Sequence, residues 1–553
     1  MKKLVLAASA ALAAGASYAQ VVLPPSADPG ALQQRRIEEE QRRLEQERLE
    51  RRPLADPLRE PAPPPAAAPA AAPAVRFTLR EIRFDPPSEV FSPEELKGMA
   101  EAYLGRETTL ADMQALVEKI NAAYRDRGIV TARALIPPQD VTDGLFTIRL
   151  VEGRLGQVTV SGNETTRESY VLDRVQAQPD RLVDLPSLQA SLVQFNRTND
   201  AQLRAELKPG QTFGRTDLDI AVMEPSRHVF RVGVDNYGSE ATGENRLGLS
   251  YTNQSLLGWR DALTLGAMTA SGLKSMSVDY GFPVSRSGGR LNLTVNRDDT
   301  ALKHGPFAEL DITGESTATA LSLRQPVHFT ERSQTVLLAG LRRRDVENDI
   351  SDIFLSGTKT DDVQLGVEYQ YTGDASQWVA SYSVYNGRAT SAGERAKYTV
   401  GRGAVRHARF WGGGWGLRGT VSFQHTSSEG LPSGEYFFLG GEGSVRGYPV
   451  GALSGDRGLI LSLELQHPLM DAGPAGGRFS ANGFFFIDTG HVKFVLPPDS
   501  ILEKAETLSS LGWGANLYLG RHVSARVTLA YAMDKLPEED KRLSVRLMVN
   551  SQF

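Results

Sequence analysis

The sequence predicts a mainly β fold, in which a 16-stranded antiparallel transmembrane β-barrel follows an N-terminal helix and two α+β units. Residues 227–553 alternate apolar and polar side chains over segments of about ten residues, which is the pattern of barrel strands. Beyond the N-terminus, no apolar run approaches the roughly 18 residues of a spanning helix. Residues 76–152 and 153–226 repeat one order of strands and helices, which predicts two similar α+β units.

The N-terminus has the features of a secretory signal peptide. Two lysines precede an apolar run, and residues 17–19 form the small-x-small pattern of a cleavage site. We therefore assign residues 1–19 to a signal peptide and expect the mature chain to leave a bacterial cytoplasm.

The composition excludes several classes of function. The 553 residues contain no cysteine, which excludes a disulfide framework and a thiolate metal site. The net charge of -5 and the lack of a large basic patch argue against nucleic acid as a partner. There is no G-x-S-x-G motif, and the eight histidines show no close pairing. We expect no enzymatic activity, no cofactor and no metal.

The segment at residues 20–52 is predicted to contain a polar helix at 31–52. This stretch lacks Gly and Pro and carries many opposite charges three or four residues apart. Its few apolar residues are too sparse for a core-facing stripe, so the helix belongs in water or in a water-filled cavity. Residues 53–75 contain eight prolines and predict an extended linker. At roughly 3.1 Å per residue such a linker reaches about 70 Å, enough to cross a bilayer.

Each α+β unit is predicted to have the order β-α-α-β-β. In the first unit we expect helices starting near Ser92 and Thr109, and strands over 77–84, 131–139 and 145–153. In the second unit we expect helices over about 165–177 and 186–200, and strands over 155–162, 201–210 and 216–224.

The last segment of the chain shows the barrel pattern most clearly. Its apolar side chains are Leu543, Val545, Leu547, Val549 and Phe553, with polar residues at most of the positions between them. Sixteen strands would leave about 20 residues for each strand and its connection. A barrel of this size must hold water or a plug in its lumen. The alternative is a soluble all-β domain, which the signal peptide and the long alternation disfavour.

The stretch GGEGSVRGYP at residues 440–449 raises the question of a phosphate-binding loop. Its glycines read G-x-G-x-x-x-G, no lysine follows, and a strand-like segment rather than a helix comes next. We therefore reject a nucleotide site. The surrounding residues, about 426–458, are predicted to form a loop without secondary structure, and loops of that length are usually functional or disordered.

The stretch FFFIDTG contains the second informative charge. Alternation places Phe485 and Ile487 on one face of a strand and Phe486, Asp488 and Gly490 on the other. An aspartate that faced lipid would be costly, so Asp488 is predicted to face the lumen.

The order of these segments resembles the outer-membrane transporters of two-partner secretion, the TpsB branch of the Omp85 superfamily. The α+β units are similar to POTRA domains, and one set of residues matches the family's signature in the second unit: Phe195, Asn196, Arg197, Pro209 and Gly210. Taken singly, these residues read as core and turn positions.

The resemblance also implies roles for two barrel motifs and for the last residue. The VRGY motif would form the tip of a loop that follows the eleventh strand and folds into the lumen; its residues are Val445, Arg446, Gly447 and Tyr448. The F-x-D motif on the barrel wall, the partner of Arg446, would be formed by Phe486, Asp488 and Gly490. Phe553 would be the signal read by the barrel-assembly machinery, or simply a lipid-facing aromatic.

The resemblance implies a passive pore in the bacterial outer membrane, with the POTRA domains in the periplasm. The implied substrate is a secreted, unfolded, β-rich exoprotein: an adhesin, a haemolysin or a contact-dependent toxin. The helix at 31–52 would plug the lumen at rest, and the transporter would be a monomer in lipid. The alternatives are an Omp85-type assembly factor, which usually has more POTRA domains, a barrel-embedded hydrolase and a diffusion porin.

Overall fold

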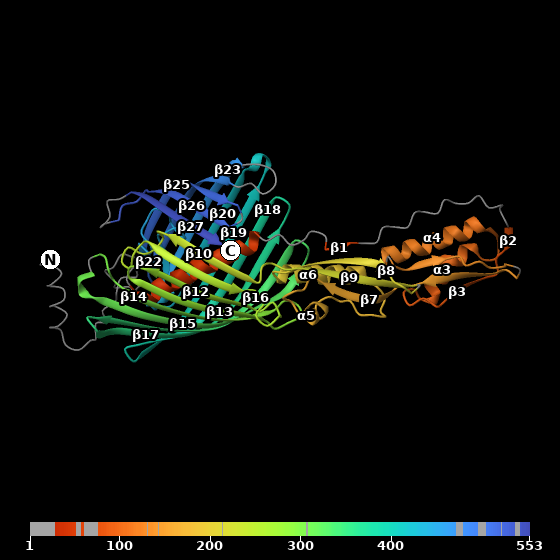
Figure 1. The fold of residues 1–553 in the computed structure, drawn as a ribbon, viewed down its shortest axis with the longest axis horizontal. Helices are drawn as coiled ribbons and strands as arrows, with labels where there is room; N and C mark the ends of the chain where they lie inside the picture. The colour runs from red at the N-terminus through yellow and green to blue at the C-terminus, as the bar shows by residue number, and fades with distance from the viewer. Residues whose placement is uncertain are drawn as a thin grey trace.

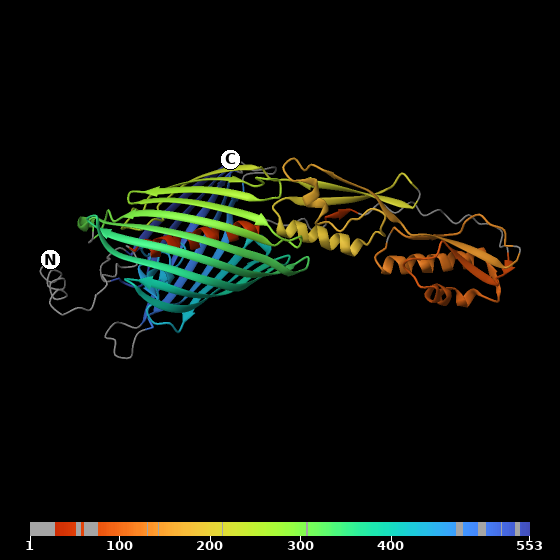
Figure 2. The same cartoon turned by 90° about the horizontal axis from the view of Figure 1, so that it is seen from below.

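The computed structural model describes residues 28–50, 57–59, 76–129, 131–141, 143–212, 214–305, 308–471, 479–495, 505–520, 522–536 and 542–553. In the first helix it describes side chains as far as Arg43. The predicted signal peptide and most of the predicted linker lie outside these residues. A barrel occupies one end of the molecule, and the two α+β units extend from it in a row (Figures 1 and 2).

The first α+β unit keeps the predicted succession of strand, two helices and two strands, but it has a short 3-10 helix and an additional short strand, β4, between the two helices. Its elements are β2 (Arg76–Thr78), β3 (Glu81–Asp85), α3 (Pro93–Ala100), η1 (Glu101–Tyr103), β4 (Glu107–Thr109), α4 (Leu110–Asp126), β5 (Arg133–Leu135) and β6 (Leu145–Val151). Ser92 and Thr109 form capping boxes at the starts of α3 and α4. The backbone hydrogen bond from Ser92 and the contact with Arg127 lower the pKa of the Glu95 carboxyl.

Two predicted strands of this unit are shorter than expected. The strand predicted over 77–84 is divided into β2, which pairs with β4, and β3, which pairs with β6. The strand predicted over 131–139 is limited to β5, which ends just before Pro137 and Pro138. Proline has no backbone N–H to donate to a neighbouring strand, which explains this early end.

The second unit also follows the predicted order. Its elements are β7 (Arg154–Ser161), α5 (Glu168–Leu172), α6 (Leu185–Thr198), β8 (Gln202–Pro209) and β9 (Arg215–Met223). The helix predicted over 165–177 is reduced to α5, because the residues before it are held as a loop. Thr165 donates from its backbone N–H and its hydroxyl to Glu224 Oε2, at 2.8 and 2.7 Å.

Part of the predicted linker joins the sheet of the second unit. Strand β1 (Leu58–Arg59) pairs in parallel with β8, giving the strand order β1-β8-β9-β7. Leu58 is buried in the core of this unit, and Ala205 donates its backbone N–H to the carbonyl of Pro57 at 2.8 Å. The linker sequence gave no indication of this contact.

Sixteen antiparallel strands among the described residues close the barrel, as predicted. They are β10 (His228–Asp235), β11 (Arg246–Asn253), β12 (Ala262–Ala270), β13 (Leu273–Pro283), β14 (Arg290–Ala301), β15 (Ile312–Phe329), β16 (Ser333–Ile350), β17 (Ile353–Thr372), β18 (Ser376–Ser391), β19 (Glu394–Phe410), β20 (Gly416–Thr426), β23 (Arg457–Asp471), β24 (Ser480–Lys493), β25 (Ala505–Leu519), β26 (Val523–Ala532) and β27 (Leu543–Gln552). β10 pairs with β27 and completes the ring.

The two faces of the strands differ as the alternation predicted. On β24, Phe485 is 66% exposed on the outer surface, whereas Phe486 is 5% exposed on the inner side. The apolar row of the last strand also faces outward: Leu543, Val545, Leu547, Val549 and Phe553. An apolar outer band is what a barrel presents to lipid. Among the described helices, none is both long and apolar enough to cross a membrane.

The connection between β20 and β23, the eleventh and twelfth barrel strands, enters the lumen. It contains η4 (Ser433–Glu435) and a two-stranded sheet of β21 (Phe437–Leu439) and β22 (Leu453–Gly455). The expectation that this loop has no secondary structure is therefore wrong. Apolar residues on both arms of the loop and at its tip pack against the inner wall in one cluster, and this packing stabilises the short sheet; the fully buried members of the loop include Leu439, Val445 and Tyr448.

Candidate functional site in the barrel lumen

Helix α2 (Pro29–Glu50) lies inside the barrel, where both views show it between the strands (Figures 1 and 2). It begins two residues before the predicted start. Asp28 caps it, because Ala31 donates its backbone N–H to Asp28 Oδ1 at 2.8 Å. The predicted plug helix is therefore present in the lumen.

The helix contacts the wall mainly through polar side chains. Three pairs connect it to β15, β14 and β11: Gln33–Ser316, Arg36–Asp298 and Glu39–Arg246. Gln33 donates to the Ser316 carbonyl at 2.8 Å and accepts from the Ser316 hydroxyl at 2.8 Å. Arg36 binds the carboxylate of Asp298 through Nε and Nη2, with a shortest distance of 2.8 Å. Alternating inward positions on the strands supply these partners.

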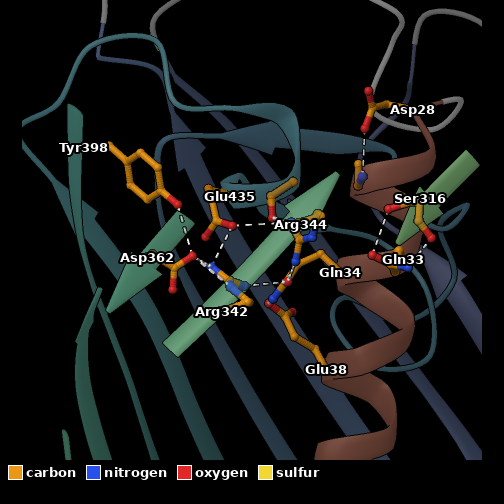
Figure 3. A network of polar contacts seen from close by, with 12 residues as sticks. Asp28, Gln33, Gln34, Glu38, Ser316, Arg342, Arg344, Asp362, Tyr398 and Glu435 are labelled. Carbon is orange, nitrogen blue, oxygen red and sulfur yellow. Dashed lines mark hydrogen bonds and ion pairs between the residues drawn. The ribbon is translucent and has the colours of Figure 1, made fainter. Parts of the chain in front are cut away.

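A second polar network joins the helix, the loop and the wall strands β16 to β19 (Figure 3). Glu435 of η4 is completely buried and accepts hydrogen bonds from three arginines of β16 and β19: Arg342 at 2.7 Å, Arg344 at 3.3 Å and Arg402 at 2.9 Å. Gln34 of the helix accepts from Arg342 at 3.1 Å and from Arg344. Sequence reasoning did not identify this network.

Arg446 and Asp488, the two charges that the sequence singled out, lie in direct contact. Arg446 donates from Nε and Nη2 to the two carboxylate oxygens of Asp488, at 2.7 and 2.8 Å. The side chain of Arg446 is 5% exposed and that of Asp488 is 0% exposed. A bidentate pair of this kind fixes both distance and orientation, so it holds the loop tip against β24.

The surroundings of this pair complete the coordination of the arginine. Its Nη1 donates to Glu464 Oε2 at 2.9 Å, and Nη2 donates to the Ser462 hydroxyl at 3.3 Å. The guanidinium lies over the ring of Phe486, 3.5 Å from its centroid. Phe486 thus contributes a stacking surface to the site, in addition to the charge of Asp488.

The remaining motif residues let the loop approach the wall closely. Gly447 has a φ of 94°, a conformation that side chains other than glycine rarely adopt. A Cβ at Gly490 would lie 2.6 Å from Leu439 and 2.8 Å from Val445. Tyr448 donates its hydroxyl to the backbone carbonyl of Ser509 at 2.8 Å. These contacts place Val445, Gly447, Tyr448 and Gly490 in the same loop–wall interface.

A second ion pair at the loop tip was missed by sequence reasoning. Arg526 of β26 donates to Glu442 at 3.3 Å and to Glu464 at 3.0 Å. Glu464 therefore bridges Arg526 and Arg446. The alternation that placed Asp488 inside the barrel also places Glu464 and Arg526 inside. This alternation could have identified both of them as lumen residues. Their pairing was not predictable, because no local pattern connects residues so far apart in sequence.

The signature residues of the second unit occupy core and turn positions. Phe195 is 1% exposed and packs against the ring of Tyr170. The side chain of Asn196 accepts a hydrogen bond from the backbone N–H of Leu203 at 2.6 Å and donates one to the carbonyl of Leu203 at 3.0 Å. Pro209 ends β8, and Gly210 donates its N–H to the Arg215 carbonyl at 3.0 Å. Burial lowers the pKa of the Arg197 guanidinium.

The second unit is joined to the barrel by a buried ion pair. Arg260, in the turn between β11 and β12, is fully buried and donates to both carboxylate oxygens of Asp200, one at 2.9 Å. Trp259 of the same turn packs edge-to-face on Tyr170 of α5, with ring centroids 6.2 Å apart. These contacts fix the position of the second unit against the barrel rim.

Phe553 lies at the seam that closes the barrel. Its ring is 67% exposed, and its backbone exchanges two hydrogen bonds with Phe230 of β10, at 2.9 and 3.1 Å. The residue therefore pairs with the first strand while its side chain faces outward. Within the parts of the chain that the structure describes, no group of acidic, histidine or cysteine side chains is arranged to hold a metal ion.

Comparisons with known proteins agree with this architecture. Residues 77–153 match the ShlB-type POTRA domain. The heme/hemopexin transporter protein HuxB of Haemophilus influenzae is 23% identical over 483 residues, covering 83% of this chain and 84% of that protein. The outer membrane transporter CdiB of Dickeya dadantii is 27% identical over 417 residues, covering 70% and 72%.

A solved structure shares the fold. CdiB from Escherichia coli superimposes with a TM-score of 0.67 at 20% identity, covering 97% of this chain and 100% of that one. Residues 214–516, more than half of the chain, match the family model described as haemolysin secretion/activation protein ShlB/FhaC/HecB. The chain belongs to this family of outer-membrane transporters, a branch of the Omp85 superfamily.

Proposed function

We propose that this outer-membrane transporter recognises an unfolded, β-rich exoprotein in the periplasm and moves it through the barrel lumen to the cell surface without ATP. The observation that carries the proposal is a closed barrel whose lumen holds a polar helix, with the chain leading from that helix to the second α+β unit. A removable plug connected to a periplasmic binding unit suits a pore that must stay closed until its substrate arrives.

The contacts of α2 support its role as the removable part. Its contacts with the wall are hydrogen bonds and ion pairs, and the polar groups that form them can bond to water once the helix leaves. Among its described side chains, the buried apolar ones are Pro29 and Ala31. Removing the helix therefore exposes little apolar surface. Most of the linker that would let it leave lies outside the described residues.

The lumen loop is anchored differently. Leu439, Val445 and Tyr448 pack into an apolar cluster with the wall, and Arg446 is bound to Asp488. Burying an apolar side chain stabilises by roughly 1.5–3 kcal/mol. Because water cannot replace apolar contacts of this kind, these three side chains make the loop harder to displace than the helix. We therefore infer that the helix opens the pore while the loop stays in place.

The sheets of the α+β units provide a binding mode for an unfolded substrate. An extended chain can add to a sheet edge through main-chain hydrogen bonds, almost regardless of its sequence. In the second unit β1 covers β8 along only two residues, opposite Ala205 and Glu206. We propose that an exoprotein strand replaces β1 and extends this pairing along β8.

The finer identity of the partners is also a proposal. We infer a TpsA-like β-helical exoprotein, which would be an adhesin, a haemolysin or a contact-dependent toxin. Its folding at the surface would give the transport its direction. We further propose that the chain acts as a monomer, that the barrel-assembly machinery reads Phe553, and that residues 153–226 form a second POTRA domain beside the first at 76–152.

Export of the exoprotein tests the function. The chain would be expressed together with a long β-helical protein from the adjacent reading frame, in cells lacking other transporters of this family. We expect the exoprotein in the medium or accessible to protease on intact cells. An exoprotein retained in the periplasm, with the barrel folded in the membrane, would contradict the proposal. Insertion of other barrel proteins instead of export would favour an assembly factor.

A further inference from the structure

The lumen wall beside helix α2 presents a cluster of three arginines, which we call the arginine cradle: Arg342, Arg344 and Arg402. Figure 3 shows Arg342 and Arg344 beside Glu435 and Gln34. Two of them come from β16 and one from β19. All three donate to Glu435, and Arg342 also donates to Asp362 at 2.7 and 2.9 Å. The cradle is separate from the loop-tip pair at Arg446 and belongs to no motif found in the sequence.

The charges of the cradle do not balance without the helix. Among the described residues hydrogen-bonded in this network, three guanidinium groups meet two carboxylates, Glu435 and Asp362. On the helix, Asp28 lies within electrostatic range of Arg344, and Glu38 lies within range of Arg402, and both carboxylates also lie within range of Arg35 of the helix itself. The wall and the loop alone therefore hold one more guanidinium than carboxylates in this network.

The side-chain amide of Gln34 supplies the direct contact between helix and cradle. Its oxygen accepts from Arg342 at 3.1 Å and from Arg344, while its nitrogen donates to Glu38 at 2.7 Å. Arg344 is only 2% exposed, so the loss of Gln34 would leave part of a buried guanidinium without an acceptor. A buried guanidinium without acceptors is costly, and a carboxylate is its best replacement partner.

The cradle keeps its shape without the helix, because wall and loop residues hold it. Arg402 donates to Gln424 at 2.7 Å, and the guanidinium groups of Arg342 and Arg402 lie 5.5 and 5.0 Å from the ring centroid of Tyr385. Beside the helix, a cavity of about 240 Å³ is lined by Arg402 and by a further arginine of β19, Arg406. A preorganised basic surface next to open space can accept a new chain.

We propose that the arginine cradle binds acidic segments of the translocating polypeptide, and that helix α2 occupies it at rest as an internal substitute. This inference rests on the translocation function proposed above. An arriving segment rich in Asp or Glu supplies the carboxylates that the helix withdraws. The cradle thereby favours exchange of the plug for substrate and keeps the exposed arginines paired during transport.

The test uses the full-length chain in planar bilayers. The double variant Gln34→Ala, Glu38→Ala removes the direct hydrogen bonds of the helix to the cradle and the nearby charge of Glu38, and we expect it to raise the conductance. A decamer of glutamate added from the periplasmic side should then block the current, and a decamer of lysine should not. Adding Arg402→Gln should raise the half-blocking concentration about fivefold or more, the effect of one partly buried ion pair.

The matched control is Arg324→Gln, which removes another lumen-side arginine, paired with Glu368 at 2.7 Å. It should change the half-blocking concentration less than about twofold, since it lies outside the cradle. Arg402→Lys keeps the charge and should retain most of the block. If Arg402→Gln does not insert into the bilayer, Arg402→Lys is measured in its place.

Three outcomes would overturn the inference: equal effects of the two arginine-to-glutamine variants, equal block by both peptides, or unchanged conductance of the double variant. None of them would affect the export assay, so this inference can fail while the proposed function stands.

Discussion

Arg446 and Asp488 form the contact on which the position of the lumen loop depends. Both side chains are almost fully buried, and their bidentate geometry leaves little freedom of movement. Removing one member of a buried pair typically costs about 3–5 kcal/mol, because the other charge remains desolvated. Here Glu464 also contacts Arg446, and it moderates the loss if Asp488 is removed.

The first prediction concerns the wall side of this pair. Asp488→Ala should destabilise the folded barrel by about 3 kcal/mol and reduce export strongly, because Arg446 loses its bidentate partner. Heat-dependent gel mobility measures the stability of the barrel. The control is Arg297→Ala, which removes an exposed pair with Glu315 and should cost at most about 1 kcal/mol. Equal losses in the two variants would contradict a special role for Asp488.

At the scale of elements, the N-terminal segment connects the lumen to the second unit. Helix α2 lies in the lumen, and a few residues later β1 adds to the edge of β8. Displacement of β1 by a substrate strand would release the chain that leads to the helix. Capture of the substrate and opening of the pore are therefore physically linked in one segment.

A disulfide between β1 and β8 tests this link. Arg59 lies opposite Glu206, and neighbouring strands are about 4.8 Å apart, within the range that a disulfide spans. Because the native chain has no cysteine, Arg59→Cys with Glu206→Cys gives a single pair. We expect export to stop in oxidising medium and to return with a reductant. Export that continues through the oxidised variant would show that β1 need not leave.

The joint between the second unit and the barrel gives another prediction at this scale. Arg260→Ala should loosen the second unit, since the ion pair between the fully buried Arg260 and Asp200 is lost. Spin labels at the exposed positions Arg204→Cys and Arg332→Cys should show a broader distance distribution than in the native background. As a control, Arg286→Gln removes an exposed contact with Asp173 at the same joint and should leave the distribution narrow.

At the scale of the whole molecule, the sequence predicted the architecture because each part of the chain has its own residue pattern. Alternation predicted the barrel and the inward side of Asp488, and charge patterning predicted a polar helix that needs water. The short strand β1 was not predictable, because its two residues carry no pattern and their partner lies in another unit. The same reason explains why the three arginines that converge on Glu435 were missed: their proximity depends on the register of the neighbouring strands β16 to β19 and on the fold of the loop.

Passage through the lumen is the central claim, and contact between a trapped exoprotein and the inner wall tests it most directly. The exoprotein would be stalled during export by a folded domain fused to its C-terminal end. A photocrosslinker on Ser383→Cys, which faces the cavity beside α2, should capture it. The same reagent on Leu365→Cys, an outward-facing position of β17 that is 64% exposed, should not. Equal capture at both positions, or capture at the outer position alone, would contradict transport through the barrel.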